Sequence, residues 1–156
     1  MTSLRRTIGR LRPLVLVEDG LEAALREEAK SACNRAALVS CEVTSELDGR
    51  LDPVVETALF RVAQQALANV VDHAGATHAL VAIECSAKGV TLRVSDDGRG
   101  FDPDQVLADI AHFGLIAMRE RVEALGGRFL VITAPGDGTV VEAKLPLTDP
   151  IVRWEP

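Results

Sequence analysis

One segment of the sequence predicts both a strand of the fold and a candidate binding residue. It reads Val90-Thr91-Leu92-Arg93-Val94-Ser95-Asp96-Asp97-Gly98-Arg99-Gly100. Apolar and polar residues alternate along its first part, which is typical of a strand with one buried face. If the alternation continues, Asp96 points the same way as the buried valines and Asp97 faces outward. A carboxylate in phase with a core costs free energy unless something satisfies it. Asp96, rather than Asp97, is therefore the candidate ligand-binding residue.

The final apolar strand repeats this arrangement. Val141, Ala143 and Leu145 share one face of the segment 139–145, and Thr139 is in phase with them. A polar group again lies at the mouth of the predicted core. Outward from these two strands, hydrophobic periodicity and turn residues predict helices over 4–11, 18–36, 54–74 and 114–125, and further strands over 38–44, 79–85 and 128–133.

The predicted helix over 54–74 carries a broad apolar stripe and an ordered set of polar residues. Arg61, Gln65, Asn69 and His73 step by four, so they line up along one side of this helix. From the spacing alone, a solvated surface line and a functional line are equally good interpretations.

Composition limits the kinds of partner that the chain can have. The 156 residues, 47% of them hydrophobic, suit one globular domain with a substantial core. A formal net charge of −6 repels nucleic acid and anionic membranes, so a nucleotide would have to be captured by a local site. The first thirty residues do not resemble a signal peptide, and no apolar stretch approaches the length of a transmembrane helix. We expect a cytoplasmic domain without nucleic-acid or membrane contact.

The polar residues singled out above have the chemistry that a nucleotide needs. Adenine offers an exocyclic amino donor, and Asp96 and Thr139 are inward-facing acceptors by their strand phase. Phosphates need backbone N–H groups, which a helix beginning at Gly114-Leu115 supplies with the positive end of its dipole. Magnesium prefers oxygen ligands and keeps several waters, so the amide oxygen of Asn69 is a plausible protein ligand.

Four blocks of sequence, in this order, carry a resemblance to a known family. They are Phe60-Arg61-Val62-Ala63-Gln64-Gln65-Ala66-Leu67-Ala68-Asn69-Val70-Val71-Asp72-His73-Ala74, Asp96-Asp97-Gly98-Arg99-Gly100, His112-Phe113-Gly114-Leu115-Ile116-Ala117-Met118-Arg119-Glu120-Arg121, and Gly138-Thr139. Together they resemble the N box, the glycine boxes and the lid helix of the catalytic ATP-binding domain of two-component sensor histidine kinases. These kinases belong to the GHKL (Bergerat-fold) ATPase superfamily. The resemblance covers residues 4–147.

This resemblance implies an α+β fold, a two-layer α/β sandwich in which helices back a mixed sheet. ATP would lie between the N-box helix and a mobile lid. The implied organisation is the end of a dimerisation helix and its linker over 1–13, an ATP-binding catalytic domain over 14–147 and a C-terminal tail over 148–156.

The resemblance also implies roles for individual residues. Asp96 would bind the adenine amino group, and Asn69 would be the magnesium ligand. The residues completing the adenine pocket would be Gly98, Gly100 and Thr139, and those flanking the phosphates would be His112, Gly114 and Leu115. For His112, an ordinary position on the lid surface is an equally good interpretation.

Two positions depart from the family pattern. The family usually has a glutamate four residues before the N-box asparagine, where it orients or deprotonates the attacking group, but this chain has Gln65. An amide can orient by hydrogen bonding yet cannot take a proton. Ala117 replaces a second glycine of the lid-helix motif. Both departures bear on the rate of phosphoryl transfer more than on ATP binding.

The leading functional hypothesis is a protein histidine kinase domain that uses ATP and Mg²⁺ to phosphorylate a histidine outside this chain. Its partners would be its own dimerisation and phosphoacceptor domain and a helix-turn-helix response regulator, and a membrane anchor elsewhere in the full-length protein stays open. A nucleotide-binding pseudokinase or regulatory module is the alternative that Gln65 favours, and an anti-sigma-type serine kinase is a further one. We expect this chain alone to bind ATP as a monomer without phosphorylating itself.

Overall fold

The computed structural model describes residues 12–38, 40–105 and 110–147, without the side chains of 110–112. The predicted helix over 4–11 and the tail over 148–156 lie outside these residues, so those two domain assignments stay predictions. In chain order the elements are α2 (Leu14–Asp19), α3 (Leu21–Arg35), β1 (Ser40–Ser45), α4 (Pro53–Asn69), the π-helical turn η1 (Val70–Ala74), β2 (His78–Ser86), β3 (Gly89–Asp96), α5 (Ile110–Glu123), β4 (Arg128–Thr133) and β5 (Thr139–Leu145).

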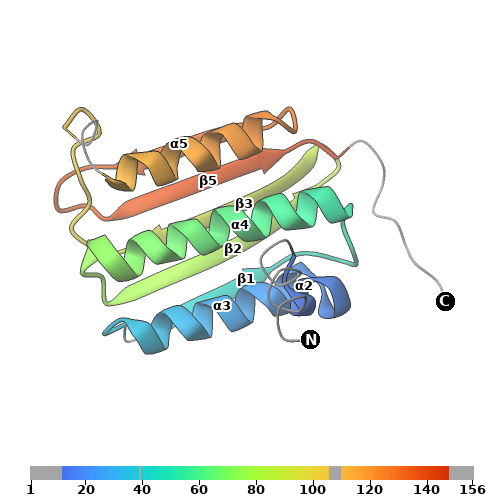
Figure 1. Cartoon of the computed structure of the whole chain (residues 1–156), viewed down its shortest axis with the longest axis horizontal. Coiled ribbons are helices and arrows are strands. Elements are labelled where there is room, and N and C mark those ends of the chain that lie inside the picture. The colour runs from blue at the N-terminus through green and yellow to red at the C-terminus, as the bar shows by residue number, and fades with distance from the viewer. Residues whose placement is uncertain (1–11, 39, 106–109, 148–156) are drawn as a thin grey trace, which may run out of the picture.

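The strands form one mixed sheet in the order β1-β2-β3-β5-β4. β1 pairs with β2 in parallel, and the other neighbouring pairs are antiparallel. Helices α3, α4 and α5 cover one face of this sheet, with α4 in the middle (Figure 1). The predicted two-layer α+β sandwich is confirmed.

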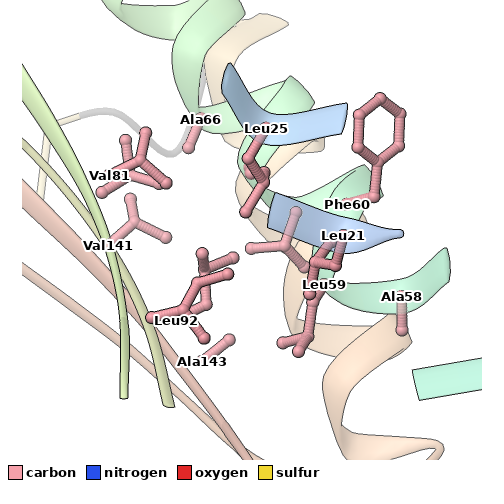
Figure 2. Close-up of a cluster of buried hydrophobic side chains, with 14 of the residues drawn as sticks. Leu21, Leu25, Ala58, Leu59, Phe60, Ala66, Val81, Leu92, Val141 and Ala143 are labelled. Atoms are coloured by element: carbon pink, nitrogen blue, oxygen red, sulfur yellow. The ribbon is translucent and has the colours of Figure 1, made fainter. Parts of the chain in front are cut away.

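The core lies between α4 and the central strands β3 and β5. Figure 2 shows Leu59 of α4 among side chains that include Leu92 of β3 and Ala143 of β5, and all three are buried. Val90, Leu92 and Val94 are buried along β3 as the alternation predicts. The bounds predicted for β4 and β5 agree with the structure.

Gly20 divides the predicted helix over 18–36 into two helices. Its φ of +89° lies in the left-handed region that other residues rarely adopt, so α2 ends at Asp19 and α3 begins at Leu21. A Cβ at this position would lie 3.2 Å from Cδ of Arg50. The glycine therefore both breaks the helix and leaves room for the Arg50 side chain.

The prediction that the last helix begins at Gly114 is wrong. α5 begins at Ile110, which puts Gly114 in its second turn. A glycine inside a helix costs only about 1 kcal/mol, and nothing in residues 110–113 prevents helix formation. Gly114 and Leu115 therefore follow the first turn of α5 and do not begin the helix.

The helix predicted over 54–74 changes its winding before it ends. From Val70 to Ala74 the backbone is π-helical, and Gly75 ends it with a φ of +58°. The carbonyl of Ala74 then accepts a hydrogen bond from the N–H of Arg99 at 2.8 Å. This wider turn, a feature common at functional sites, joins the end of the N-box helix to the glycine-rich loop.

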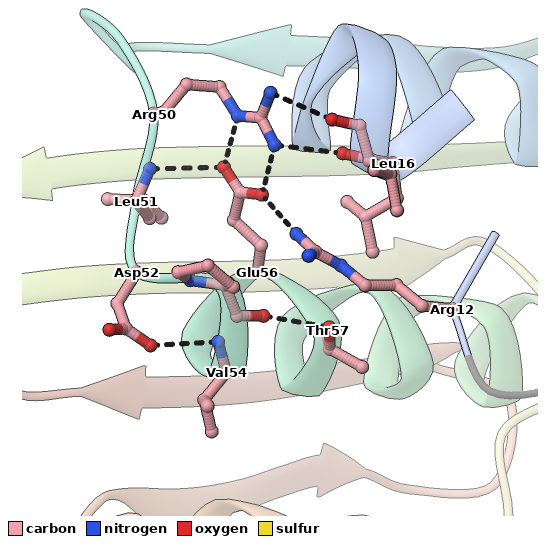
Figure 3. Close-up of polar contacts among 10 residues, drawn as sticks. Arg12, Leu16, Arg50, Leu51, Asp52, Val54, Glu56 and Thr57 are labelled. Carbon is pink, nitrogen blue, oxygen red and sulfur yellow. Dashed lines mark hydrogen bonds and ion pairs between the residues drawn. The ribbon is translucent and has the colours of Figure 1, made fainter. Parts of the chain in front are cut away.

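Glu56 is a charged residue buried at the start of α4, with 1% of its side chain exposed. Its carboxylate accepts from Nε of Arg50 at 2.8 Å, from the backbone N–H of Leu51 at 3.1 Å and from Arg12 at 3.2 Å. Arg50 also donates to the carbonyls of Leu16 and Val17 (Figure 3). The carboxylate thus connects the start of α4 to residue 12 directly and to the end of α2 through Arg50.

We predict that Glu56→Ala lowers the free energy of unfolding by about 1.5–3 kcal/mol, because its carboxylate is the charged acceptor of the buried N–H of Leu51 and of two guanidinium groups. These guanidinium groups, of Arg12 and Arg50, are 26% and 40% exposed, so water replaces part of what they lose. Chemical denaturation measures this loss. The control is Glu22→Ala, which removes the exposed pair between Glu22 and Arg26 and should cost about 1 kcal/mol or less. Equal losses in the two variants would show that Glu56 contributes no more than a surface charge.

Candidate functional site

A cavity of about 250 Å³ opens between α4 and the ends of β3 and β5. Its walls are apolar where Val94 and Val141 contribute and polar at the strand ends, where Asp96 and Thr139 meet. The cavity is lined by Ala66, Asn69, Val70, His73, Ala74, Val94, Asp96, Arg99, Gly100, Phe101, Leu115, Thr139 and Val141. Segments far apart in the sequence therefore converge on one hollow beside the core.

Asp96 is half-buried at the cavity wall, in phase with the buried residues of β3 as predicted. Burial raises the pKa of its carboxyl group, and the backbone N–H groups of Gly98 and Thr139 oppose that rise. The Gly98 N–H donates to Oδ1 of Asp96 at 2.8 Å. The loop therefore satisfies part of the hydrogen-bonding capacity of the Asp96 carboxylate. A donor group of a ligand in the cavity could satisfy the rest.

Asp97 is exposed, and its carboxylate serves the protein itself. It accepts from the backbone N–H of His78 at 2.9 Å and from the hydroxyl of Thr77 at 2.7 Å. These bonds, the one from the His78 backbone first, hold the pKa of Asp97 well below its usual range. Asp97 fixes the turn into β2, and Asp96 is the carboxylate at the cavity.

The glycine-rich loop lies very close to the end of α4. A Cβ on Gly98 would overlap the carbonyl oxygen of Ala74, and one on Gly100 would overlap that of Ala134. Gly100 also has a φ of +60°. The backbone of the loop can approach η1 and the β4–β5 connection only because these two side chains are absent.

Thr133, at the end of β4, is a residue of this site that sequence reasoning missed. Its hydroxyl accepts from the N–H of Phe101 at 3.1 Å, donates to the carbonyl of Gly138 at 3.0 Å and lies 3.0 Å from the hydroxyl of Thr139. It therefore fixes two residues of the cavity wall, Phe101 and Thr139. The alternation along β4 could have identified it, because Thr133 is in phase with the inward-facing Phe129 and Val131.

The structure brings some of the predicted site residues to the cavity and leaves others beside it. Those that line it are Asn69, Asp96, Gly100, Leu115 and Thr139. Gly98 donates its N–H to Asp96, Gln65 is hydrogen-bonded to Asn69, and Gly114 lies against the amide of Gln65. The side chain of His112 falls outside the described residues.

Comparison with known proteins agrees with this geometry. A family model described as histidine kinase-, DNA gyrase B-, and HSP90-like ATPase matches residues 54–149. The chain belongs to this ATPase family. The matched region contains the cavity and its surrounding elements, from the start of α4 to the end of β5.

Relatives of this ATPase domain include sensor kinases. The histidine-protein kinase/phosphatase DegS of Brevibacillus brevis is 34% identical over 95% of this chain, which spans 38% of DegS. The sensor histidine kinase NarS of Mycobacterium tuberculosis is 36% identical over 92% of the chain, which spans 33% of NarS. The chain is thus an ATP-binding catalytic domain of the histidine-kinase type, about two fifths or less of the length of these relatives.

Solved structures agree on the fold of the ATPase domain. The histidine kinase AdeS of Acinetobacter baumannii superposes with a TM-score of 0.67 at 19% identity, over 95% of this chain and 80% of AdeS. The histidine kinase domain of a blue-light-activated kinase from Erythrobacter litoralis gives a TM-score of 0.62 at 22% identity, over 82% of this chain and 61% of that domain.

We predict that Thr133→Val weakens nucleotide binding by the ATPase domain roughly threefold to thirtyfold, because it leaves the N–H of Phe101 without its acceptor and frees Thr139. Titration calorimetry measures the affinity. Thr57→Val is the matched control, since the Thr57 hydroxyl donates to the carbonyl of Pro53, away from the cavity. Unchanged affinity in Thr133→Val would mean that the wall keeps its shape without this hydroxyl.

Proposed function

We propose that this domain holds ATP for transfer of its γ-phosphoryl group to a histidine of a phosphoacceptor domain, within a sensor histidine kinase. The observation that supports this most directly is Asp96, a half-buried carboxylate facing a cavity with apolar walls. The amino group of adenine is a donor, and a charged acceptor in such a slot selects for it. The relatives named above are sensor kinases, which supports the same function.

In this proposal the base and the phosphates occupy different parts of the site. The adenine amino group donates to Asp96, and the residues around the base are Gly98, Gly100 and Thr139. The phosphates extend toward the start of α5, because the N-terminal end of a helix favours anions. The residues proposed to flank them are His112, Gly114 and Leu115.

Asn69 is the residue proposed to meet a magnesium ion. Among the described residues, no group of three or more His, Cys, Asp or Glu side chains could hold a metal. A single amide oxygen at the cavity wall fits an ion held mainly by phosphates and water. Such an ion neutralises charge on the phosphoryl group that is transferred.

Gln65 limits what the domain itself contributes to the reaction. Its amide cannot accept a proton from the attacking imidazole. The domain would therefore act by holding the γ-phosphoryl in line with an acceptor and by neutralising charge, which supply most of the rate in phosphoryl transfer.

The proposed partners are the protein's own dimerisation and phosphoacceptor domain and, downstream, a helix-turn-helix response regulator. The proposed location is the cytoplasm, where ATP is available. None of the helices within the described residues is long and apolar enough to cross a bilayer.

A nucleotide-sensing module without transferase activity is a second candidate, and Gln65 is the observation that favours it. Full-length protein incubated with γ-labelled ATP distinguishes the candidates through the acid lability of the label. We expect acid-labile phosphohistidine. Acid-stable label would favour a serine kinase, and ATP binding without any label would favour the sensing module.

We predict that Asp96→Asn weakens ATP binding by about 1.5–3 kcal/mol, because the amide loses the charge-assisted bond and presents a donor to the adenine amino group. Calorimetric titration with matched thermal melts separates lost affinity from lost folding. Asp97→Asn makes the same chemical change one residue later and should bind ATP much as the wild type does. If Asp96→Asn keeps the wild-type affinity, Asp96 does not bind the base.

A further inference from the structure

Gln65 lies one helical turn before Asn69 on α4 and is hydrogen-bonded to it. Nε2 of Gln65 donates to Oδ1 of Asn69 at 3.3 Å. Asn69 lines the cavity, and Gln65 is not among the lining residues. The amide oxygen proposed to meet magnesium therefore already accepts a hydrogen bond from within the domain.

Helix α5 confines the Gln65 side chain. A Cβ on Gly114 would lie 2.9 Å from Nε2 and 3.2 Å from Cδ of Gln65, closer than real Cβ atoms normally approach. The backbone of α5 thus rests directly against the carboxamide, where α5 packs on α4 (Figure 1). Because Gln65 is only partly exposed, the position of α5 controls the room that its amide has beside Asn69.

An amide at position 65 acts on Asn69 differently from a carboxylate. A carboxylate only accepts hydrogen bonds, so Asn69 would turn its NH₂ group toward it and its oxygen toward the cavity. The NH₂ group of Gln65 instead attracts the oxygen of Asn69, as the observed bond shows. In this arrangement the amide at position 65 occupies the Asn69 oxygen, which a carboxylate at the same position could not do.

We propose that Gln65 is a positioning residue that competes with magnesium for the amide oxygen of Asn69. The proposal rests on the function proposed above for the cavity. Nucleotide binding by this chain then depends only weakly on magnesium.

The test measures the magnesium gain, defined as the affinity for a non-hydrolysable ATP analogue with Mg²⁺ divided by that with chelator, by calorimetry on this chain. Gln65→Met keeps the side-chain length but removes the donor, so the gain should rise about threefold to tenfold, the value of one hydrogen bond. Gln65→Glu should raise it at least as much. Gln64→Glu is the charge control, because Gln64 bonds Arg61 and not Asn69, and its gain should stay at the wild-type value.

Asn69→Ala shows whether the effect passes through the asparagine. In that background the magnesium gain should be lost, and Gln65→Met should no longer change it. Thermal melts confirm that each variant folds. If the wild type binds the analogue but the magnesium gain of Gln65→Met is equal to or smaller than that of the wild type, only the positioning role is overturned. Failure of the wild type to bind the analogue under either condition overturns the proposed function and this inference together.

Discussion

The two-residue period of β3 carries a carboxylate to the point where the core ends, and the cavity is arranged around that carboxylate. Asp96 follows Val90, Leu92 and Val94 in the same phase, and its partial burial disfavours the charged form. Neighbouring backbone must therefore come close enough to donate hydrogen bonds. It does so because Gly98 has no side chain, and Gly138 likewise approaches the Asp96 carbonyl where a Cβ would collide with it.

Strand phase made much of this predictable from the sequence. It distinguished Asp96 from Asp97, because a period of two leaves little choice once one face is buried. The bounds of β4 and β5 followed from the turn residues at 126–127 and 134–138. Phase with a buried face, which has a period of two in a strand and 3.6 in a helix, also reaches two residues that were not singled out. Thr133 continues the inward face of β4, and Glu56 precedes Leu59 and Ala63 of the apolar stripe by three and seven residues. In all three cases the sign was a polar residue in phase with a buried face.

Features that depend on contacts between elements could not be found in this way. Gly114 looks like a helix start in the sequence, yet it lies inside α5, where its missing Cβ admits the amide of Gln65. The π-helical turn after Asn69 likewise has no local sequence signature. The carbonyl of Ala74 at its end finds its hydrogen-bond donor, the N–H of Arg99, in a distant segment. Such features depend on the contact between two segments, so they cannot be predicted from the sequence of either segment alone.

The network around Glu56 has a mechanical consequence. Arg12 and Arg50 both donate to one buried carboxylate on the first turn of α4, and Arg50 also donates to the carbonyls of Leu16 and Val17 at the end of α2. These bonds restrict the movement of residue 12 relative to α4, the helix that carries Asn69. A displacement of the backbone at Arg12 would therefore be transmitted to α4 through these bonds.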